Sequence, residues 1–528
     1  MATAALAACV PEISATSSQF VTPAPSKGAP ATTGASSSSD TSVTLSPDVS
    51  IALAAAPAAI SLFSGPRTNV WRFSGQVLSG DPSSLQPVPD SYLGPTFRVK
   101  KGQRLHITYT HDLPQESIVH WHGLHVPAEM DGHPRYAIKR GEKYEYSFDI
   151  RNRAGTYWYH PHPHGSTGPQ VYAGMAGFFL VHDDEELTLG LPSDEFDIPL
   201  VIQDRVFDDD NQLLYRANGM MDQMMGFLGD RILVNGRPNF TLPVSTRAYR
   251  LRLLNGSNSR IYKLGWSDGS PFTVIGNDGG LLEKPVQRPY ITLAPAERVE
   301  LWVDFSDKSV GEEIVLRSLP FPSPMGMGGM MMGGAVGMPQ GAPFDILTVK
   351  IAMQSSHRLQ LPQQLSTIER LSPQDAVASK QIVLAMRPPN GWTLNGRSFQ
   401  MTSVAPEERI RLGSIEIWEF INAGGGMRGG MGGGMMGRGM MSLPHPMHMH
   451  GEQFQILDRE IDRAGRNVWE SLKDGFVDEG WKDTVLVLPG EKVRVIRRFG
   501  DFTGLYLYHC HNLEHEDMGM MRNFEVVA

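Results

Sequence analysis

Cysteine is scarce in this 528-residue chain, which has only Cys9 and Cys510, at opposite ends of the sequence. A disulfide framework therefore does not hold the fold together, and Cys510 needs another explanation. Long hydrophobic runs are also missing: the most apolar stretch, 51–63, is interrupted by Pro57 and falls well short of the roughly 20 residues that span a bilayer. Positive charge does not predominate, and the net charge of −9 argues against a nucleic-acid-binding protein.

Methionine and histidine are the residues that the chain has in excess, with 27 Met and 17 His. The histidines are clustered, which is typical of a protein that handles a metal bound by imidazole or by sulfur. The 55 Gly and 38 Pro favour turn-rich β structure.

Short alternating runs separated by Gly, Pro, Asp and Asn turns predict an all-β fold of consecutive β-sandwiches. We expect three domains, at 66–190, 191–355 and 378–528, with a linker at 356–377 in which 365–371 forms a short helix. Residues 1–65 are rich in Ala, Ser, Thr and Pro, and we expect them to form a flexible tether. The runs that carry the prediction are 71–75, 96–100, 105–109, 232–236, 249–255, 299–303, 392–396 and 415–420.

Methionine is concentrated in three segments. Two of them, 324–343 and 424–442, scatter Met among Gly, and this glycine content predicts loops rather than helices or strands. The third, 220–225, is compatible with a helix.

The first residues carry a possible targeting signal. Leu6-Ala7-Ala8-Cys9 resembles a bacterial lipobox, in which the cysteine is lipidated, and a polar tether follows it. This predicts a lipid anchor on Cys9 and a start codon upstream of Met1; the alternative is a chance match in an Ala-rich stretch.

Four histidine groups lie in the first and third predicted domains. In an extended strand a His-x-His pair places both imidazoles on one face, about 6.6 Å apart, which suits the bridging of two metal ions. One such pair is common by chance, but four in one chain indicate a metal cluster. The groups are His120-Trp121-His122, His160-Pro161-His162, His445-Pro446-Met447-His448-Met449-His450 and His509-Cys510-His511.

The last group adds a second kind of site. Cys510, His515 and Met520, with the distant His445, form the His₂Cys set with a weak axial Met that marks a blue electron-transfer copper. Because side chains alternate along a strand, the histidines on either side of Cys510 point to the opposite face. One strand therefore connects the blue copper to the other metal sites.

Together, these four motifs resemble the copper motifs of the three-domain multicopper oxidases, over a region from about residue 66 to the end. They are most similar to those of bacterial periplasmic laccase-like and copper-efflux oxidases. The resemblance implies three consecutive cupredoxin-like Greek-key β-sandwich domains, four copper ions and reduction of O₂ to water by a monomer in the bacterial periplasm or cell envelope.

The resemblance also implies a role for each ligand. Two histidine pairs are open in the second motif, His160 with His162 and His162 with His164. The preceding Gly155-Thr156-Tyr157-Trp158-Tyr159 favours His160 with His162. The expected ligands are His445, Cys510, His515 and Met520 for type 1 copper; His120 and His448 for type 2; His122, His160 and His511 for one type 3 ion; and His162, His450 and His509 for the other.

Proton delivery and the electron donor remain to be assigned. Asp131 and Glu516 occupy positions where related oxidases carry acids near the oxygen path, so they join Cys510 as catalytic candidates; ordinary solvated carboxylates are the alternative. Soft Met ligands favour Cu(I) as the donor, in a role in copper tolerance. Met441 and Leu443 stand where copper-efflux oxidases carry an Asp and a Met of a substrate-copper site. Phenol or aromatic amine oxidation therefore stays open, as does non-catalytic copper binding.

Overall fold

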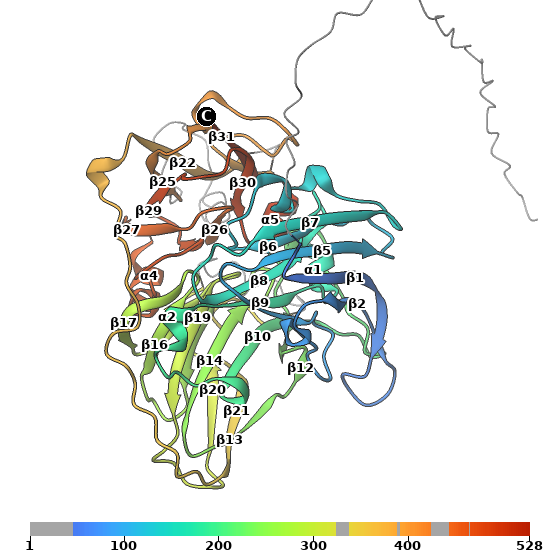
Figure 1. Cartoon of the computed structure of the whole chain (residues 1–528), viewed down its shortest axis with the longest axis vertical. Helices are drawn as coiled ribbons and strands as arrows, with labels where there is room; N and C mark the ends of the chain where they lie inside the picture. The colour runs from blue at the N-terminus through green and yellow to red at the C-terminus, as the bar shows by residue number, and fades with distance from the viewer. Residues whose placement is uncertain (1–45, 324–336, 388–390, 424–442, 464) are drawn as a thin grey trace, which may run out of the picture. The chain divides into compact units, whose positions relative to one another are not determined.

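The computed structural model describes residues 46–528 except 324–336, 388–390, 424–442 and 464. Cys9, the segment 424–442 and most of 324–343 lie outside these residues. Pro47–Ala528 form one compact unit, and strands dominate it, which confirms the all-β prediction (Figure 1). Among the described residues, no helix has both the length and the apolar character needed to cross a membrane.

The first domain is a sandwich of two sheets around a core that includes Phe97, Trp121 and Phe179. One sheet has the order β2 (Thr68–Ser79), β1 (Val49–Ile60), β5 (Arg104–His111) and β7 (Lys143–Asp149). The other has the order β3 (Leu85–Gln86), β4 (Thr96–Lys100), β9 (Gly177–His182), β8 (Gly155–Pro161) and β6 (Val119–His122).

The second domain repeats this arrangement around its own apolar core. Its larger sheet has the order β12 (Arg237–Pro238), β11 (Arg231–Val234), β10 (Asp197–Arg205), β14 (Ala248–Asn255), β19 (Arg298–Asp304), β16 (Phe272–Asn277) and β17 (Gly280–Arg288). The smaller sheet has the order β13 (Thr241–Ser245), β21 (Phe344–Met353), β20 (Glu313–Ser318), β15 (Tyr262–Trp266) and β18 (Ile291–Leu293).

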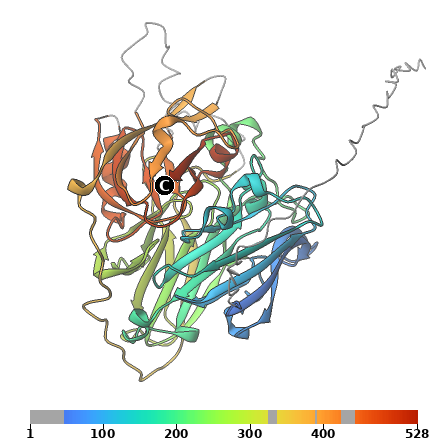
Figure 2. The same ribbon diagram turned by 45° about the horizontal axis from the view of Figure 1, so that its top comes forward.

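The third domain has two five-stranded sheets. One has the order β23 (Gly391–Leu394), β22 (Ala378–Arg387), β25 (Ile415–Ile421), β29 (Glu491–Arg498) and β27 (Phe454–Ile461). The other has the order β24 (Arg409–Arg411), β31 (Met521–Val527), β30 (Gly504–Cys510), β26 (His445–Met449) and β28 (Thr484–Val487). Figure 2 shows the three groups of strands in blue to cyan, green to yellow and orange to red.

The sheet pairings reveal a threefold structural repeat. Each domain begins with a strand parallel to a later one, in the pairs β1–β5, β10–β14 and β22–β25. In the opposite sheets, β4–β9, β13–β21 and β24–β31 are also parallel. By this equivalence the antiparallel strand pairs β6–β8, β15–β20 and β26–β30 correspond. The histidine motifs lie in the first and third of these pairs.

Two sequence-based expectations were wrong. The tether does not extend to residue 65, because β1 pairs with both β2 and β5. Val49, Ile51, Leu53 and Ala55 alternate as buried residues along β1, so small alanines complete an apolar face that the sequence composition obscured. The expected helix at 365–371 is an irregular segment, and a 3₁₀ turn at Pro373–Asp375 follows it.

In the part of the chain that the structure describes, five short α-helices accompany the strands: α1 (Thr167–Tyr172), α2 (Asp184–Leu187), α3 (Met220–Met225), α4 (Arg466–Leu472) and α5 (Leu513–Asp517). The Met cluster at 220–225 is α3, as its composition allowed. Helices α1 and α3 both contact α5, which follows the Cys510 strand.

Candidate metal centre

The antiparallel strand pairs β6–β8 and β26–β30 place the predicted ligands opposite one another. His120 pairs with His160 in the first strand pair, and His448 pairs with His509 in the second. In the second strand pair the next residue pair along is Met447 with Cys510. Because side chains alternate along each strand, Cys510 points into the core of the third domain while His448 and His509 point to the opposite face.

The cysteine site consists of His445, Cys510, His515 and Met520, all of which are buried. The Cys510 Sγ atom lies 3.4 Å from His445 Nδ1 and 3.8 Å from His515 Nδ1, and these two nitrogens are 3.3 Å apart. The main chain fixes Met520 beside them, since its carbonyl accepts from Cys510 N at 3.0 Å and its N–H donates to the His515 carbonyl at 2.9 Å. Three soft or borderline donor atoms thus converge on one point.

A single helical turn returns the chain from Cys510 to His515. The side chain of Asn512 caps α5 by accepting from His515 N. Gly519 has a φ of 97°, a left-handed conformation that glycine adopts at little cost, and the chain then passes through Met520, which is buried in the same core cluster as Cys510, into β31.

The second domain contributes the outer contacts of the cysteine site. The carbonyl of Met224 in α3 accepts from His515 Nε2 at 3.1 Å and from Trp392 Nε1 at 3.0 Å. The Trp392 ring also lies against both imidazoles, 4.8 Å from the His445 ring and 4.4 Å from the His515 ring. These contacts leave Nδ1 of His515 facing Cys510.

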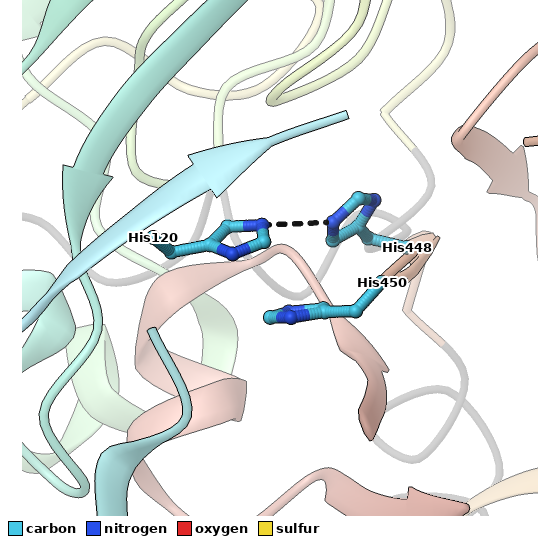
Figure 3. Close-up of side chains that lie close together, drawn as sticks. All are labelled: His120, His448 and His450. Carbon is cyan, nitrogen blue, oxygen red and sulfur yellow. Dashed lines mark hydrogen bonds between the residues drawn. The ribbon is translucent and has the colours of Figure 1, made fainter. Parts of the chain in front are cut away.

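The histidine cluster consists of His120, His122, His160, His162, His448, His450, His509 and His511, which are all buried. Nε2 of His120 faces Nε2 of His448 at 3.4 Å, and the His450 ring stacks on His120 (Figure 3). His509 Nε2 lies 3.1 Å from His450 Nε2 and 3.3 Å from His162 Nε2. Ligands of the first and third domains therefore meet at one place.

The donor atoms fit metal ions. Taken three at a time, the ligand atoms of His120–His448–His450, His120–His122–His160, His162–His450–His509 and His445–Cys510–His515 lie within 4.8 Å of one another. Among the described residues, neither nitrogen of His511 has a hydrogen-bond partner, although the side chain is buried. Buried polar atoms seldom stay unpaired, and a metal ion in the histidine cluster would supply a partner for one of them.

Burial also sets the protonation states that metal binding requires. It lowers the pKa of His160 and of His445 to about 3 and that of His162 to about 4. These imidazoles are therefore neutral near pH 7, with a lone pair available. Burial raises the pKa of the Cys510 thiol, so the thiolate forms only when a cation is present to stabilise it.

Both predicted acids lie against the histidine cluster. Asp131 Oδ2 is 2.6 Å from His450 Nδ1, the main-chain carbonyl of Asp131 is 2.6 Å from His120 Nδ1, and burial raises the pKa of its carboxyl. Glu516 Oε2 is 3.1 Å from His509 Nδ1. Burial favours the neutral acid, but the imidazoles of His509 and His162 outweigh it and hold the pKa of Glu516 at about 2.

The remaining histidines have other partners. His164 lies against the Phe399 ring, with 4.9 Å between ring centroids. His125 contacts Asp501, His133 contacts Asn523 and His182 contacts Glu186.

Sequence reasoning missed three residues that contact the predicted ligands, Met224, Trp392 and Asp483, as well as Arg298, which contacts Asp483. They come from distant parts of the chain and carry no spacing pattern. Only the composition of the 220–225 segment pointed to one of them.

A small cavity lies beside the cysteine site. It is lined by Met225 of α3, by Gln340 near the end of the segment 324–343, and by Leu443 and Pro444, which follow the segment 424–442. Asn512, the cap of α5, completes the wall on the side of His515. The residues that follow the segment 424–442 thus lie near Met225 and Gln340 beside the cysteine site.

Comparison with known proteins agrees with this geometry. Models of the multicopper oxidase family match residues 74–186 and 373–528. A laccase from Bacillus stratosphericus is 30% identical, with 88% of this chain and 91% of that protein covered. The crystal structure of McoA multicopper oxidase from Aquifex aeolicus is 33% identical with a TM-score of 0.73, covering 92% of this chain and 97% of that one. A multicopper oxidase from Campylobacter jejuni, described as a metallo-oxidase, is 26% identical with a TM-score of 0.71, covering 90% of each chain. The chain belongs to the multicopper oxidase family of copper-dependent oxidoreductases, which transfer electrons from a reducing substrate to O₂.

Proposed function

We propose that the chain binds four copper ions and oxidises Cu(I), with O₂ as the electron acceptor. The type 1 ion takes the cysteine site, and the histidine cluster holds the other three. The assignment is His120 and His448 for type 2; His122, His160 and His511 for one type 3 ion; and His162, His450 and His509 for the other.

A small cavity beside the cysteine site carries the choice of donor. It is lined by Met225, by Gln340 of the segment 324–343 and by Leu443, which directly follows the segment 424–442, next to the cap of the His515 helix. Thioethers bind Cu(I) in preference to hard cations. The surroundings of the site therefore favour a soft metal ion as the electron donor.

The burial of the type 1 ligands argues against a bulky organic donor. His515 is 0% exposed and His445 is 1% exposed, and the Nε2 atom of His515 is bonded to the Met224 carbonyl. A phenol would need an open imidazole edge. Helix α3 and Trp392 cover this edge.

The residues of the chain link the two sites and supply protons. Copper, when bound, carries single electrons and reduces O₂. Strand β30 gives a continuous covalent path from the Cys510 sulfur to the imidazoles of His509 and His511. Glu516 Oε2 lies 3.1 Å from His509 Nδ1, so this carboxylate can accept a proton and pass it on beside the cluster; Asp131, whose carboxyl has a raised pKa, is the second acid.

Localisation and assembly follow from the same proposal. A copper-oxidising enzyme of this kind protects the bacterial periplasm or cell envelope, where copper arrives. We propose a monomer with a role in copper tolerance and a lipid on Cys9. Mass spectrometry of the protein isolated from membranes would detect the lipid, and an unmodified Cys9 in the soluble fraction would contradict it.

The donor assignment is tested by removing thioethers without changing volume. Leu in place of Met221, Met224 and Met225 should lower kcat/KM for Cu(I) while the blue absorption and copper content stay unchanged. Met353→Leu, at an exposed methionine elsewhere, is the matched control. Deleting 425–438 should lower Cu(I) oxidation further and raise the oxidation of bulky phenols. Unchanged Cu(I) kinetics in both variants would refute the proposal.

Phenol or aromatic amine oxidation is the second candidate, because the Bacillus stratosphericus relative is a laccase. It predicts that phenols are oxidised faster than Cu(I) by the unmodified protein.

A further inference from the structure

Asp483, just before β28, contacts ligand histidines of two domains. Its Oδ1 lies 3.1 Å from His122 Nε2, and its main-chain carbonyl accepts from His448 Nδ1 at 2.8 Å. A neutral imidazole that donates with one nitrogen keeps its lone pair on the other. The nitrogens left free are those that face the cluster: His122 Nδ1 is 3.4 Å from His160 Nε2, and His448 Nε2 is 3.4 Å from His120 Nε2.

Arg298, the first residue of β19 in the second domain, holds the Asp483 carboxylate. Its Nη1 donates to Oδ1 at 2.7 Å and its Nη2 donates to Oδ2 at 2.5 Å. The other three N–H groups donate to the carbonyls of Thr156, Ala296 and Asp278 at 2.9–3.0 Å. All five donors of this buried guanidinium are therefore used, and they join the first, second and third domains.

Asp483 is an anchor rather than a ligand. By distance alone, His122, His448 and Asp483 could hold a metal ion. Arg298, however, occupies both carboxylate oxygens, and a metal at that point would face a fixed positive charge. The second domain has no histidine in β15 or β20, the strands equivalent to the ligand strands of its neighbours.

We propose that the second domain acts on the histidine cluster through Arg298 and Asp483, which are positioning residues for its copper ligands. They fix His122 as an Nδ1 ligand and His448 as an Nε2 ligand, and they lock the two ligand-bearing domains in register. The inference rests on the ligand assignment proposed above. Partners of this kind commonly change metal affinity 10–100-fold when they are altered.

Asp483→Asn tests the role with nearly unchanged volume. The main-chain carbonyl remains, so His448 keeps its partner, whereas the new amide has one acceptor oxygen and cannot serve His122 and both Nη atoms of Arg298 together. Competition with a chelator should therefore show roughly 10–100-fold weaker binding of type 3 copper, with the blue absorption and the type 2 electron paramagnetic resonance signal retained. Arg298→Lys keeps the positive charge but loses the two parallel hydrogen bonds to Asp483. It should weaken the binding of type 3 copper less than Asp483→Asn does.

Arg288→Gln is the matched control, because Arg288 also joins the second and third domains, through the Phe476 carbonyl, but touches no ligand histidine. It should bind cluster copper as the unmodified protein does. Unchanged type 3 affinity in Asp483→Asn, or equal loss of type 1 and type 3 copper in Arg298→Lys, would overturn the positioning role. An unmodified protein that binds copper only at the cysteine site would instead refute the ligand assignment.

Discussion

Glu514 and Glu516 lie in one turn of α5 and should respond oppositely to the same substitution. Both are buried, at 2% and 1% exposure. Glu514 accepts hydrogen bonds from Phe227 N at 2.9 Å, Asn258 Nδ2 at 2.8 Å and Tyr215 Oη at 2.9 Å. Among the described residues, the oxygens of Glu516 accept none. Glu516 Oε2 instead lies 3.1 Å from His509 Nδ1, so one carboxylate is held by three hydrogen bonds and the other faces the histidine cluster.

Glu516→Gln removes the titratable carboxylate beside the cluster, which the neighbouring imidazoles keep ionised and which can accept a proton and pass it on. The rate of O₂ reduction should fall roughly 10²–10⁴-fold, the usual contribution of a positioned acid–base group. The free energy of unfolding should decrease less than in Glu514→Gln. Glu514→Gln should do the reverse: its amide group turns one accepted bond into a contact between two donors, which costs about 1–3 kcal/mol of stability, while O₂ reduction continues at the normal rate.

Rapid mixing separates these effects. The enzyme is first reduced without oxygen, which bleaches the blue colour, and is then mixed with O₂ while reoxidation is followed. Guanidinium unfolding of each variant gives the stability. Reoxidation of Glu516→Gln at the normal rate, or equal slowing in Glu514→Gln, would refute the proton-transfer role.

Three further predictions follow from the structure. Cys510→Ser should abolish both the blue colour and oxidase activity, and a colourless variant that still reduces O₂ would contradict the assignment. Trp392→Phe keeps a ring on the two imidazoles but loses the hydrogen bond to the Met224 carbonyl, so the free energy of unfolding should decrease by about 1 kcal/mol. The same variant should speed the bleaching of type 1 copper by phenols, and unchanged phenol kinetics would contradict the shielding role. Burial lowers the pKa of His133 to about 4 in the folded protein, against about 6.5 for histidine in an unfolded chain. As the pH falls below about 6.5, the unfolded chain therefore binds a proton before the folded protein does. The free energy of unfolding should decrease by up to about 3 kcal/mol by pH 4. His133→Gln should flatten this loss, and a variant with the same pH profile as the unmodified protein would contradict the prediction.

The ligand motifs were readable from the sequence because each is local. A His-x-His pair fixes the face of a strand on which both imidazoles lie, and the spacing from Cys510 to His515 and Met520 matches one helical turn and a return strand. The all-β class was readable for a similar reason, since alternation over five residues suffices to indicate a strand.

The features that the sequence did not reveal depend on contacts between distant segments. Strand β1 was taken as part of a tether because alanines dilute its alternation, and only its pairing with β2 and β5 identifies it. Arg298 and Asp483 are ordinary charged residues 185 positions apart, and their role arises where three domains meet. Trp392 and Met224 likewise meet His515 only in the folded chain.

Oxygen uptake with Cu(I) as the sole reductant tests the central claim most directly. The reaction is followed with an oxygen electrode while a Cu(I) chelator reports the donor that remains, and Cys510→Ser serves as the blank. We predict that four Cu(I) ions are oxidised for each O₂ consumed and that no hydrogen peroxide accumulates. Oxygen uptake no faster than in the Cys510→Ser blank, from a protein that consumes O₂ rapidly with a phenol, would contradict the account.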